Sequence, residues 1–569
     1  MPNYRTPGAY IEEIAKLPPS IAESETAIPV FIGLTEKTGE PVAQPVTVFD
    51  GDFRTVWVAR INSLLEYETL FGTVAPPSIT VTILDSMNGN TVQKRSVSAS
   101  VEPGVAAQSS NMYYHMQLYF ANGGGPCYIA SAGLIIDGGP TLNMLKAGVM
   151  AMEQFDEPTL LVIPDSIVYG ELFPSAPVAT AVANAQVQFS LKNSQVYETY
   201  NTLYTAQQNY NNDASDPKTP ALVTALNDAR AAYVAALNNW YPTRPVLAAA
   251  FAGVGQDIQA AGSVYEVYNL ALDQCGRLKD RFTIIDCFGD NPAAVRDAGF
   301  RLKGDNLKYG AVYYPSLETS IGYVLDDNII YLDHRQDTNG NGVFDMPVVY
   351  GDQRVLHKVT NNEVYNTAMR AAQQLTVTLT PSAAIAGVYA SVDRTRGVWK
   401  APANVSLNYV TGVTRRVSDA EQEGLNDDPL SGKSINAIRN FTGKGTLVWG
   451  ARTLDAKSND WRYVSVRRLF IMIEESVKKA IAGFVMEPND IAVWLRVQSM
   501  IENYLTTLWR AGALQGARAK DAFYVSVGLG KTMTAQDVID GRMLVEIGLA
   551  AVRPAEFIVL RFSHLMAHV

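Results

Sequence analysis

Long apolar runs are missing from this sequence of 569 residues. No stretch of about 18 uninterrupted apolar residues occurs, which is the length that a membrane-spanning helix needs. The first residues, MPNYRTPGAYIEEIAKL, lack the apolar segment of a signal peptide. We therefore expect neither membrane insertion nor secretion by signal peptide, and we expect the chain to be made and folded in the cytosol.

Cysteine is scarce and no surplus of basic charge is present. Cys127, Cys275 and Cys287 are far apart, lack a CxxC pair and lie in apolar stretches, which favours buried thiols over a metal or redox site. Lys and Arg number 46 against 56 Asp and Glu, so the net charge is −10. Because nucleic-acid binding depends on neutralising phosphates, we expect no nucleic-acid partner.

The composition is that of a folded protein with several units, since 47% of the residues are hydrophobic and 18% are charged. Residues 1–25 are predicted to form an arm, in which prolines bound a short strand at 9–14. Residues 26–125 are predicted to be a β-rich first part of the core. It contains a strand at 26–35 and a hairpin at 78–101 that turns at Asn88-Gly89.

Strands and helices alternate over 126–168 and 263–404, which predicts a doubly wound α/β region. Two insertions interrupt it. Residues 169–262 predict a helical hairpin with helices at 178–209 and 221–239, and 318–377 predict a β-rich excursion. The ranges expected to form elements of the α/β region are strands at 127–131, 159–163, 282–287 and 311–314 with helices at 141–154, 264–278 and 292–303, and those of the excursion are strands at 323–332 and 348–350 with a helix at 361–374.

The last third is predicted to be an α+β domain at 405–552, followed by a C-terminal arm at 553–569. Helices at 464–485 and 491–510 carry apolar residues at helical spacing: Ile491, Trp494, Leu495, Ile501, Leu505 and Leu508. Strands are expected at 523–527, 542–551 and 556–562, with a short helix that begins at Thr534.

Two motifs suggest ligand binding and are better explained as turns. Gly530-Lys531-Thr532 resembles the end of a phosphate-binding loop, but that loop needs glycine where this chain has Val525. Oxygen-bearing side chains at Asp337, Asn339, Asn341 and Asp345 follow the spacing of a calcium loop. The bidentate carboxylate expected at its twelfth position is absent, so a plain hairpin loop is favoured over a weak calcium site.

No catalytic set can be recognised. His564 and His568 stand four residues apart near the end of the chain without a third metal ligand, and His115, His334 and His357 lack partner spacing. Signatures of hydrolases, metalloproteases and dinucleotide-binding proteins are missing. The carboxylates expected at strand ends, Asp165, Asp286 and Asp290, can equally cap helices. We therefore expect no enzyme, no cofactor and no firm metal site.

Three blocks of sequence together resemble the contractile tail sheath proteins of phages and of phage-derived extracellular injection systems. They lie at 4–14, at 381–404, and from 466 through 490 and 508–514 to 553–557. The insertion at 169–262 is outside the shared pattern.

The resemblance implies a sheath subunit that polymerises around an inner tube and contracts without consuming nucleotide. It implies a subtilisin-like middle region without protease residues, and it implies an inner tube protein, a baseplate and terminator or cap proteins as partners. The family's chain ends link neighbouring subunits, which assigns that role to Tyr4, Pro7, Gly8, Tyr10, Ile11, Glu12, Glu13 and Ile14 at one end and to Arg553, Pro554, Glu556, Phe557 and Val559 at the other.

Three alternatives remain open beside an extracellular injection system. The chain can belong to the tail of a contractile phage, it can be a hydrolase with a subtilisin-like core, or it can be an adhesin that binds calcium through the loop at 337–345.

Overall fold

The computed structural model describes residues 21–49, 51–102, 110–137, 139–172, 176–215, 217–254, 258–297, 302–344, 346–350 and 354–556. The chain forms two compact units. Residues 26–464 make the central unit, and residues 1–25 join 465–569 in the terminal unit. The division therefore falls at 464/465, whereas the sequence predicted the C-terminal domain to begin at 405.

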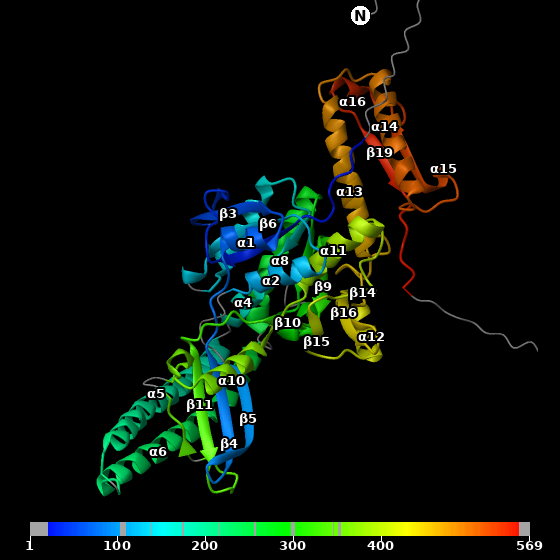
Figure 1. Ribbon diagram of the computed structural model, residues 1–569. Coiled ribbons are helices and arrows are strands. Elements are labelled where there is room, and N and C mark those ends of the chain that lie inside the picture. The colour runs from blue at the N-terminus through cyan, green and yellow to red at the C-terminus, as the bar shows by residue number, and fades with distance from the viewer. Residues whose placement is uncertain are drawn as a thin grey trace, which may run out of the picture. The chain divides into compact units, whose positions relative to one another are not determined.

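A ten-stranded sheet is the centre of the central unit (Figure 1). Its order is β14-β17-β16-β9-β8-β7-β1-β6-β3-β2, and the six strands from β16 to β6 run parallel, with antiparallel strands at both edges. The strands are β1 (Pro29–Thr35), β2 (Gln44–Phe49), β3 (Phe53–Ile61), β6 (Cys127–Leu134), β7 (Leu160–Val162), β8 (Phe282–Asp286), β9 (Gly310–Tyr314), β14 (Val405–Ser406), β16 (Ile435–Phe441) and β17 (Gly445–Val448).

The middle strands are buried because their sequences are continuous apolar runs, as in parallel sheets covered on both faces. Every residue of β1, β7, β8 and β9 is buried. Helices α2 and α11 pack together, and α3 and α4 both pack on α8. The bounds of these helices are α2 (Met112–Ala121), α3 (Leu142–Ala151), α4 (Asp165–Leu172), α8 (Ile258–Leu278) and α11 (Ser382–Arg396).

The predicted alternation of strands and helices is confirmed, but the predicted domain limits at 125/126 and 404/405 do not divide this sheet. Strand β1, from the predicted N-terminal part, lies between β6 and β7. Strands β14, β16 and β17, from the predicted C-terminal domain, continue the sheet beyond β9. Parallel pairing between distant segments leaves no local signal in the sequence, which explains the difference.

Three distant segments build one appended module, which we define as 78–102, 176–254 and 322–377. Its sheet has the order β12-β11-β4-β5, and β4 and β11 pair in parallel. The predicted hairpin at Asn88-Gly89 and the predicted helix pair are both confirmed. The elements are β4 (Ile79–Asn88), β5 (Thr91–Val101), α5 (Ala176–Asn212), α6 (Pro220–Trp240), α7 (Thr243–Val254), β11 (Ile330–Asp337), β12 (Met346–Pro347) and α10 (Asn362–Gln373).

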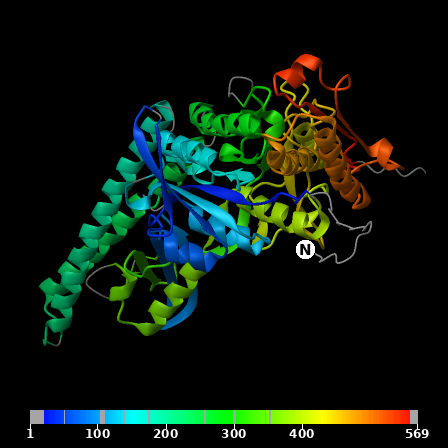
Figure 2. The same ribbon diagram turned by 90° about the horizontal axis from the view of Figure 1, so that it is seen from above.

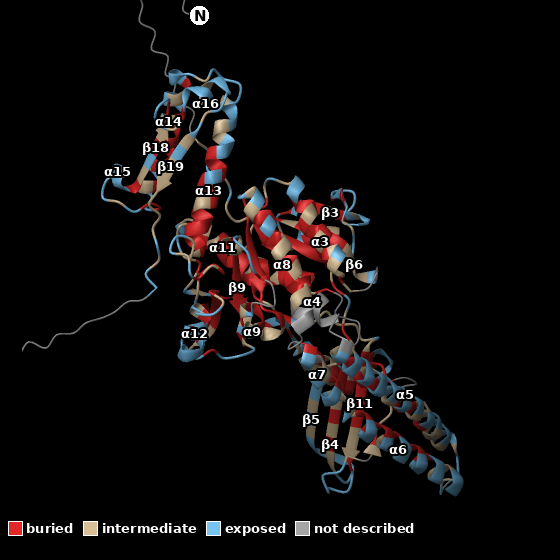
Figure 3. Cartoon of the chain, turned by 180° about the vertical axis from the view of Figure 1, so that it is seen from behind, coloured by how far each residue is buried: buried red, intermediate tan, exposed pale blue. Residues whose placement is uncertain are grey.

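The module has apolar cores of its own. One forms between the long helices around Phe189, Tyr233 and Trp240, and another between the sheet and α10 around Ile83 and Leu332. Figure 2 shows the long antiparallel pair of α5 and α6, and Figure 3 shows that much of its outer surface is exposed.

The terminal unit consists of helices and a two-stranded antiparallel sheet. Of the three strands that the sequence predicted here, those at 523–527 and 542–551 are β18 and a shorter β19, and residues 557–562 of the third lie outside the described residues. Asp490 caps α14, where its side chain accepts from Val493 N–H at 2.9 Å, and Thr534 caps α16 with a capping box. The elements are α13 (Val464–Ile481), α14 (Ile491–Arg510), α15 (Ala519–Ala522), β18 (Phe523–Val527), α16 (Ala535–Ile539) and β19 (Val545–Leu549). None of the described helices is long and apolar enough to span a membrane.

Three element predictions were wrong in extent or place. The strand expected at 348–350 is β12, which pairs with β11 through Met346 and Pro347 and ends before Val348. The helix expected at 292–303 is α9 (Pro292–Arg296), and it ends because Asp297 adopts a non-helical conformation with ψ of 129°. The strand expected at 323–332 contains a turn, in which the Asp326 carboxylate accepts from Asn328 N–H at 2.9 Å. The strands lie on either side, as β10 (Leu317–Gly322) and β11.

Candidate assembly surfaces

The carboxyl ends of β1 and β7 meet where α/β proteins of this strand order commonly bind ligands, because the chain connections diverge there. Here the Asp165 carboxylate occupies that point. It accepts from Leu34 N–H at 2.7 Å and from Asn111 N–H at 3.1 Å. Burial raises the pKa of Asp165 to about 6. A Cβ on Gly33 would lie 2.4 Å from the Asp165 carboxylate, so the packing requires glycine.

Asp286 and Asp290 are also used within the fold. Asp286 is the last residue of the buried β8 and accepts from Ser382 N–H at 3.0 Å, at the first turn of α11. It also accepts from the hydroxyls of Ser382 and Thr380, at 2.6 and 2.9 Å. Asp290 accepts from the backbone and side chain of Ser316. All three strand-end carboxylates therefore stabilise the chain's own backbone, and none is joined to a histidine.

The one Asp–His pair found among the described residues links strands of the appended module. His334 Nε2 lies 2.8 Å from the Asp85 carboxylate, and its Nδ1 lies 2.8 Å from the Tyr350 hydroxyl. Arg95 donates two hydrogen bonds to Asp85, at 2.7 and 2.9 Å, and its guanidinium also reaches Glu363. Burial lowers the pKa of His334 and raises that of Tyr350 to about 12.

The remaining ligand-like motifs behave as turns or buried groups. Thr532 Oγ1 donates to Leu544 O at 2.7 Å and accepts from Gly528 N–H, so the loop binds itself rather than a phosphate. Burial raises the pKa of Cys127, Cys275 and Cys287, which are buried and unlinked as predicted. His115 is buried and its pKa is lowered to about 3 by desolvation. His564 and His568 lie outside the described residues.

The loop proposed as a weak calcium site is partly described. The Asp337 carboxylate accepts from Asn339, Asn341 and Gly342 N–H, at 3.2, 3.3 and 2.7 Å. These bonds hold a tight turn, and Asp345 lies outside the described residues. Within the described chain, no cluster of three His, Cys, Asp or Glu residues could hold a metal ion.

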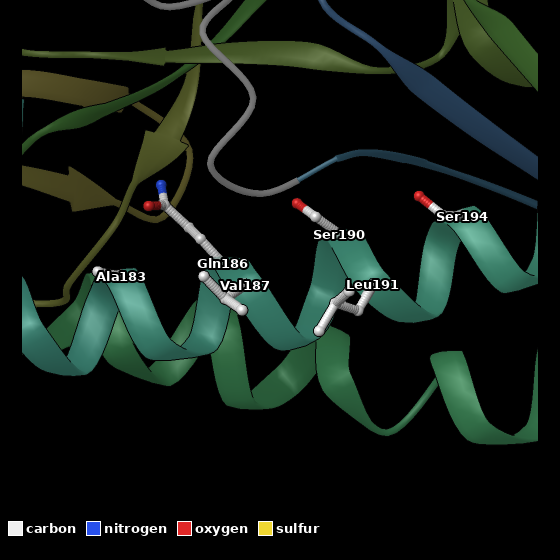
Figure 4. A pocket seen from close by; sticks show the side chains of 6 residues that line it. All are labelled: Ala183, Gln186, Val187, Ser190, Leu191 and Ser194. Atoms are coloured by element: carbon white, nitrogen blue, oxygen red, sulfur yellow. The ribbon is translucent and has the colours of Figure 1, made fainter.

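A shallow hollow on α5 is lined by one face of a single helix (Figure 4). Val187 and Leu191 are about half exposed there. The lining contains no titratable group, so it has no means of acid–base chemistry. Its residues are Ala183, Gln186, Val187, Ser190, Leu191 and Ser194.

The two-stranded sheet of the terminal unit has unused edges. Strands β18 and β19 pair over five residues, from Phe523 with Leu549 to Val527 with Val545. Among the described residues, no further strand pairs with either one. A two-stranded sheet is marginally stable by itself, and its outer edges present unpaired backbone groups.

The described residues of both predicted arms belong to the terminal unit. Ser24 N–H donates to Ser476 Oγ at 2.9 Å, so the described end of the first arm lies on α13. Burial raises the pKa of Glu23 and raises that of Tyr504, on α14, to about 12. Of the predicted linking residues, Arg553, Pro554 and Glu556 are described, whereas residues 4–14, Phe557 and Val559 lie outside the described residues.

The sequence missed an exposed apolar surface at the start of α14. Ile501, Leu505 and Leu508 are buried as expected, but Ile491 and Leu495 are 67% and 57% exposed. The helical spacing of the apolar residues did not distinguish the exposed positions from the buried ones. Val485 and Met486, just before α14, are also exposed.

A family model matches the end of the chain, and curated proteins match about a quarter of the chain. Residues 456–564 match the family described as phage tail sheath C-terminal domain. The tail sheath protein of Burkholderia phage BcepMu is 30% identical over 161 residues, which are 28% of this chain and 33% of the relative. That of Vibrio phage KVP40 is 28% identical over 134 residues, 24% of this chain and 20% of the relative. The chain thus spans a third or less of these curated relatives.

Structural comparisons cover nearly the whole chain. A chain of the anti-feeding prophage baseplate is 28% identical, with 99% of this chain and all of that chain covered and a TM-score of 0.52. The contracted helical sheath of the anti-feeding prophage gives 28% identity, coverage of 98% and 99%, and a TM-score of 0.53. The contracted sheath of the extracellular contractile injection system PVC is 25% identical. The match covers 99% of this chain and 98% of that chain, with a TM-score of 0.50.

Proposed function

Because this chain belongs to the contractile tail sheath family, we propose that it is a structural subunit that polymerises around an inner tube and drives that tube through a target envelope when the polymer contracts. The observation that carries this proposal is the likeness to contractile sheaths over nearly the whole chain. The family is structural and not enzymatic, in accord with the carboxylates that stabilise the chain's own backbone.

We favour an extracellular contractile injection system over a phage tail. The structures of such systems match 98% or more of this chain, whereas the curated phage relatives match 28% or less. The subunit would then assemble in the bacterial cytoplasm and act in a released particle. Its partners would be further copies of itself, an inner tube protein, a baseplate, and a terminator or cap protein.

The units receive different roles in this proposal. The doubly wound core corresponds to the subtilisin-like region of the family, used as a scaffold without catalysis. The terminal unit faces the tube and carries the lattice, and the exposed start of α14 suits such a contact. The appended module faces outward, where additions are tolerated because no neighbour is needed there.

The arms are proposed to link neighbouring subunits through the open sheet of β18 and β19. An extended arm from another copy could add a strand at either edge and satisfy the unpaired backbone groups. Each added hydrogen bond contributes roughly 0.5–1.5 kcal/mol net, against the entropy of ordering an arm. Repeated around a ring, such links would let subunits slide and rotate without separating.

The test is to change the first arm and examine assembly by electron microscopy. Deletion of 1–16, or Tyr10→Pro, should abolish tubes, because proline removes a backbone donor from the added strand. Tyr10→Ala is the matched control, since it keeps that donor. Circular dichroism of the core should stay unchanged in all variants. Normal tubes from the deletion variant would exclude arm exchange and leave the family assignment intact.

A further inference from the structure

Two hairpins lie at opposite edges of the ten-stranded sheet, β2–β3 at one edge and β16–β17 near the other, with only the two-residue β14 beyond it. Their turns lie at the same end. Strand β16 runs parallel to β9, so its last residue, Phe441, is at the carboxyl end of the parallel strands. Strand β3 runs antiparallel to both β6 and β2, so the last residue of β2, Phe49, is at that end as well.

The β2–β3 hairpin exposes a pair of aromatic rings beside an acidic turn. Phe49 and Phe53 face each other across the strands, with ring centroids 5.0 Å apart. They remain 61% and 75% exposed, so they pack on each other rather than on the core. Asp52, in the turn, has a side chain that is 73% exposed, and its carboxylate lies 3.8 Å from the less exposed Arg54 guanidinium. This tip combines apolar surface with negative charge.

The β16–β17 hairpin carries a second aromatic pair beside basic groups. The rings of Phe441 and Trp449 lie 4.6 Å apart, and Trp449 is 37% exposed. The Arg439 guanidinium lies 5.3 Å from the centroid of the Phe441 ring and donates to the Asp419 carboxylate at 2.6 Å, so its charge is paired within the chain. Lys444 is exposed in the turn itself. This tip combines apolar surface with positive charge.

We infer that these two tips meet between neighbouring copies of this chain, the acidic aromatic hairpin of one copy docking on the basic aromatic hairpin of the next. The inference rests on the proposed function and adds a contact outside the arms. The chain carries a net charge of −10, so copies repel each other except where opposite charges face. The two tips lie at opposite edges of the sheet but at the same end of its strands. If each copy is related to the next by the same rotation, the acidic tip of every copy can therefore meet the basic tip of its neighbour, and the contacts close a ring.

Removing the aromatic pair tests the contact. Phe49→Ser with Phe53→Ser should raise the concentration needed for tube formation at least about tenfold and lower the melting temperature only slightly, because both side chains are largely exposed and lose only their contact with each other. Leu65→Ser is the matched control, since Leu65 is 71% exposed on α1 (Leu64–Phe71), outside the hairpin. Assembly of the double variant at the concentration of the unchanged chain would overturn the inference.

Charge reversal tests the pairing of the tips. Asp52→Lys and Lys444→Asp should each raise the concentration needed for tube formation by about the same factor. The double variant should lower that concentration most of the way back to the value of the unchanged chain. A double variant that is weaker than either single variant would contradict the pairing.

Cysteine cross-linking tests which surfaces meet. A mixture of Asp52→Cys and Lys444→Cys chains should give a disulfide-linked dimer under mild oxidation, whereas either variant alone should not. The natural cysteines are buried, so the background should be low. Tubes without this cross-link, or dimers from one variant alone, would overturn the inference and leave the proposed function standing. Failure of the unchanged chain to form tubes would instead overturn the proposed function.

Discussion

Two buried carboxylates, Asp165 and Asp286, hold the carboxyl-terminal edge of the parallel sheet. Each accepts backbone hydrogen bonds from a segment that follows or borders the sheet. The sequence located them at strand ends and suggested helix caps as one of two roles. It could not show that each is desolvated, because the donors come from residues 54 to 131 positions away.

Asp286 should give folding a distinctive dependence on pH. Its pKa is raised from 3.8 to about 6, mainly by burial. The stabilisation by the protonated form is therefore fully present below about pH 4 and is lost as the pH rises to about 6. In Asp286→Asn this loss disappears, and the hydroxyls of Thr380 and Ser382 can reverse to accept from the amide. Relative to the unchanged chain, the free energy of unfolding of the variant should rise by up to about 3 kcal/mol across this range.

Urea unfolding of unassembled protein at pH 4 and pH 7 measures this difference. Thr380→Val is the control, because it removes one hydrogen bond and keeps the titrating carboxyl group, so its pH dependence should persist. An Asp286→Asn variant that follows the pH dependence of the unchanged chain would show that this carboxyl group does not cause it.

Arg95 should be important for the appended module, because Asp85 is fully buried beside it. Arg95→Ala leaves that carboxylate without its bidentate partner and should destabilise the module by about 3 kcal/mol. Hydrogen exchange of the β4 and β5 amides measures the loss. The double variant Arg95→Ala with Asp85→Asn should recover part of the lost stability of the module, because no buried charge then remains unpaired. Unchanged protection in Arg95→Ala would show that the ion pair contributes little.

At the scale of elements, the sequence predicts single helices, strands and hairpins from local patterns, but it does not predict which distant strands pair. The Asn88-Gly89 turn predicted the hairpin of β4 and β5, and uninterrupted apolar runs predicted β7 and β8. The partner of β4 is β11, about 250 positions further along the chain. A parallel partner that far away leaves no local signal in the sequence. The hairpin of β4 and β5 was therefore predicted to belong to the core, whereas it belongs to the appended module. The exposed Ile491 and Leu495 were missed because helical spacing does not identify what a face contacts.

Shortening the α5–α6 hairpin tests whether it lies outside the lattice. Removing 204–229 with a four-residue Gly/Ser linker keeps the contacts of Phe189 with Trp240 and of Tyr200 with Tyr233. The module should therefore fold, and tubes should form with a smaller outer diameter in electron micrographs. A folded variant that forms no tubes would show that the hairpin makes a lattice contact.

At the scale of the whole molecule, the proposed sheath needs no bound nucleotide. Two packings of the same subunits that differ in free energy can supply the work of contraction. The rigid elements suit this role, because the buried sheet keeps each subunit intact while the open edges of β18 and β19 can keep subunits linked. The hairpin tips would then change neighbours between the two packings.

Electron microscopy of the purified full-length chain, at rising concentration and with tube formation scored against sedimentation, tests the central claim most directly. The account predicts hollow tubes or stacked rings that form above a threshold concentration, without any nucleotide. A chain that stays monomeric at every concentration, including in the presence of its inner tube protein, would contradict the account.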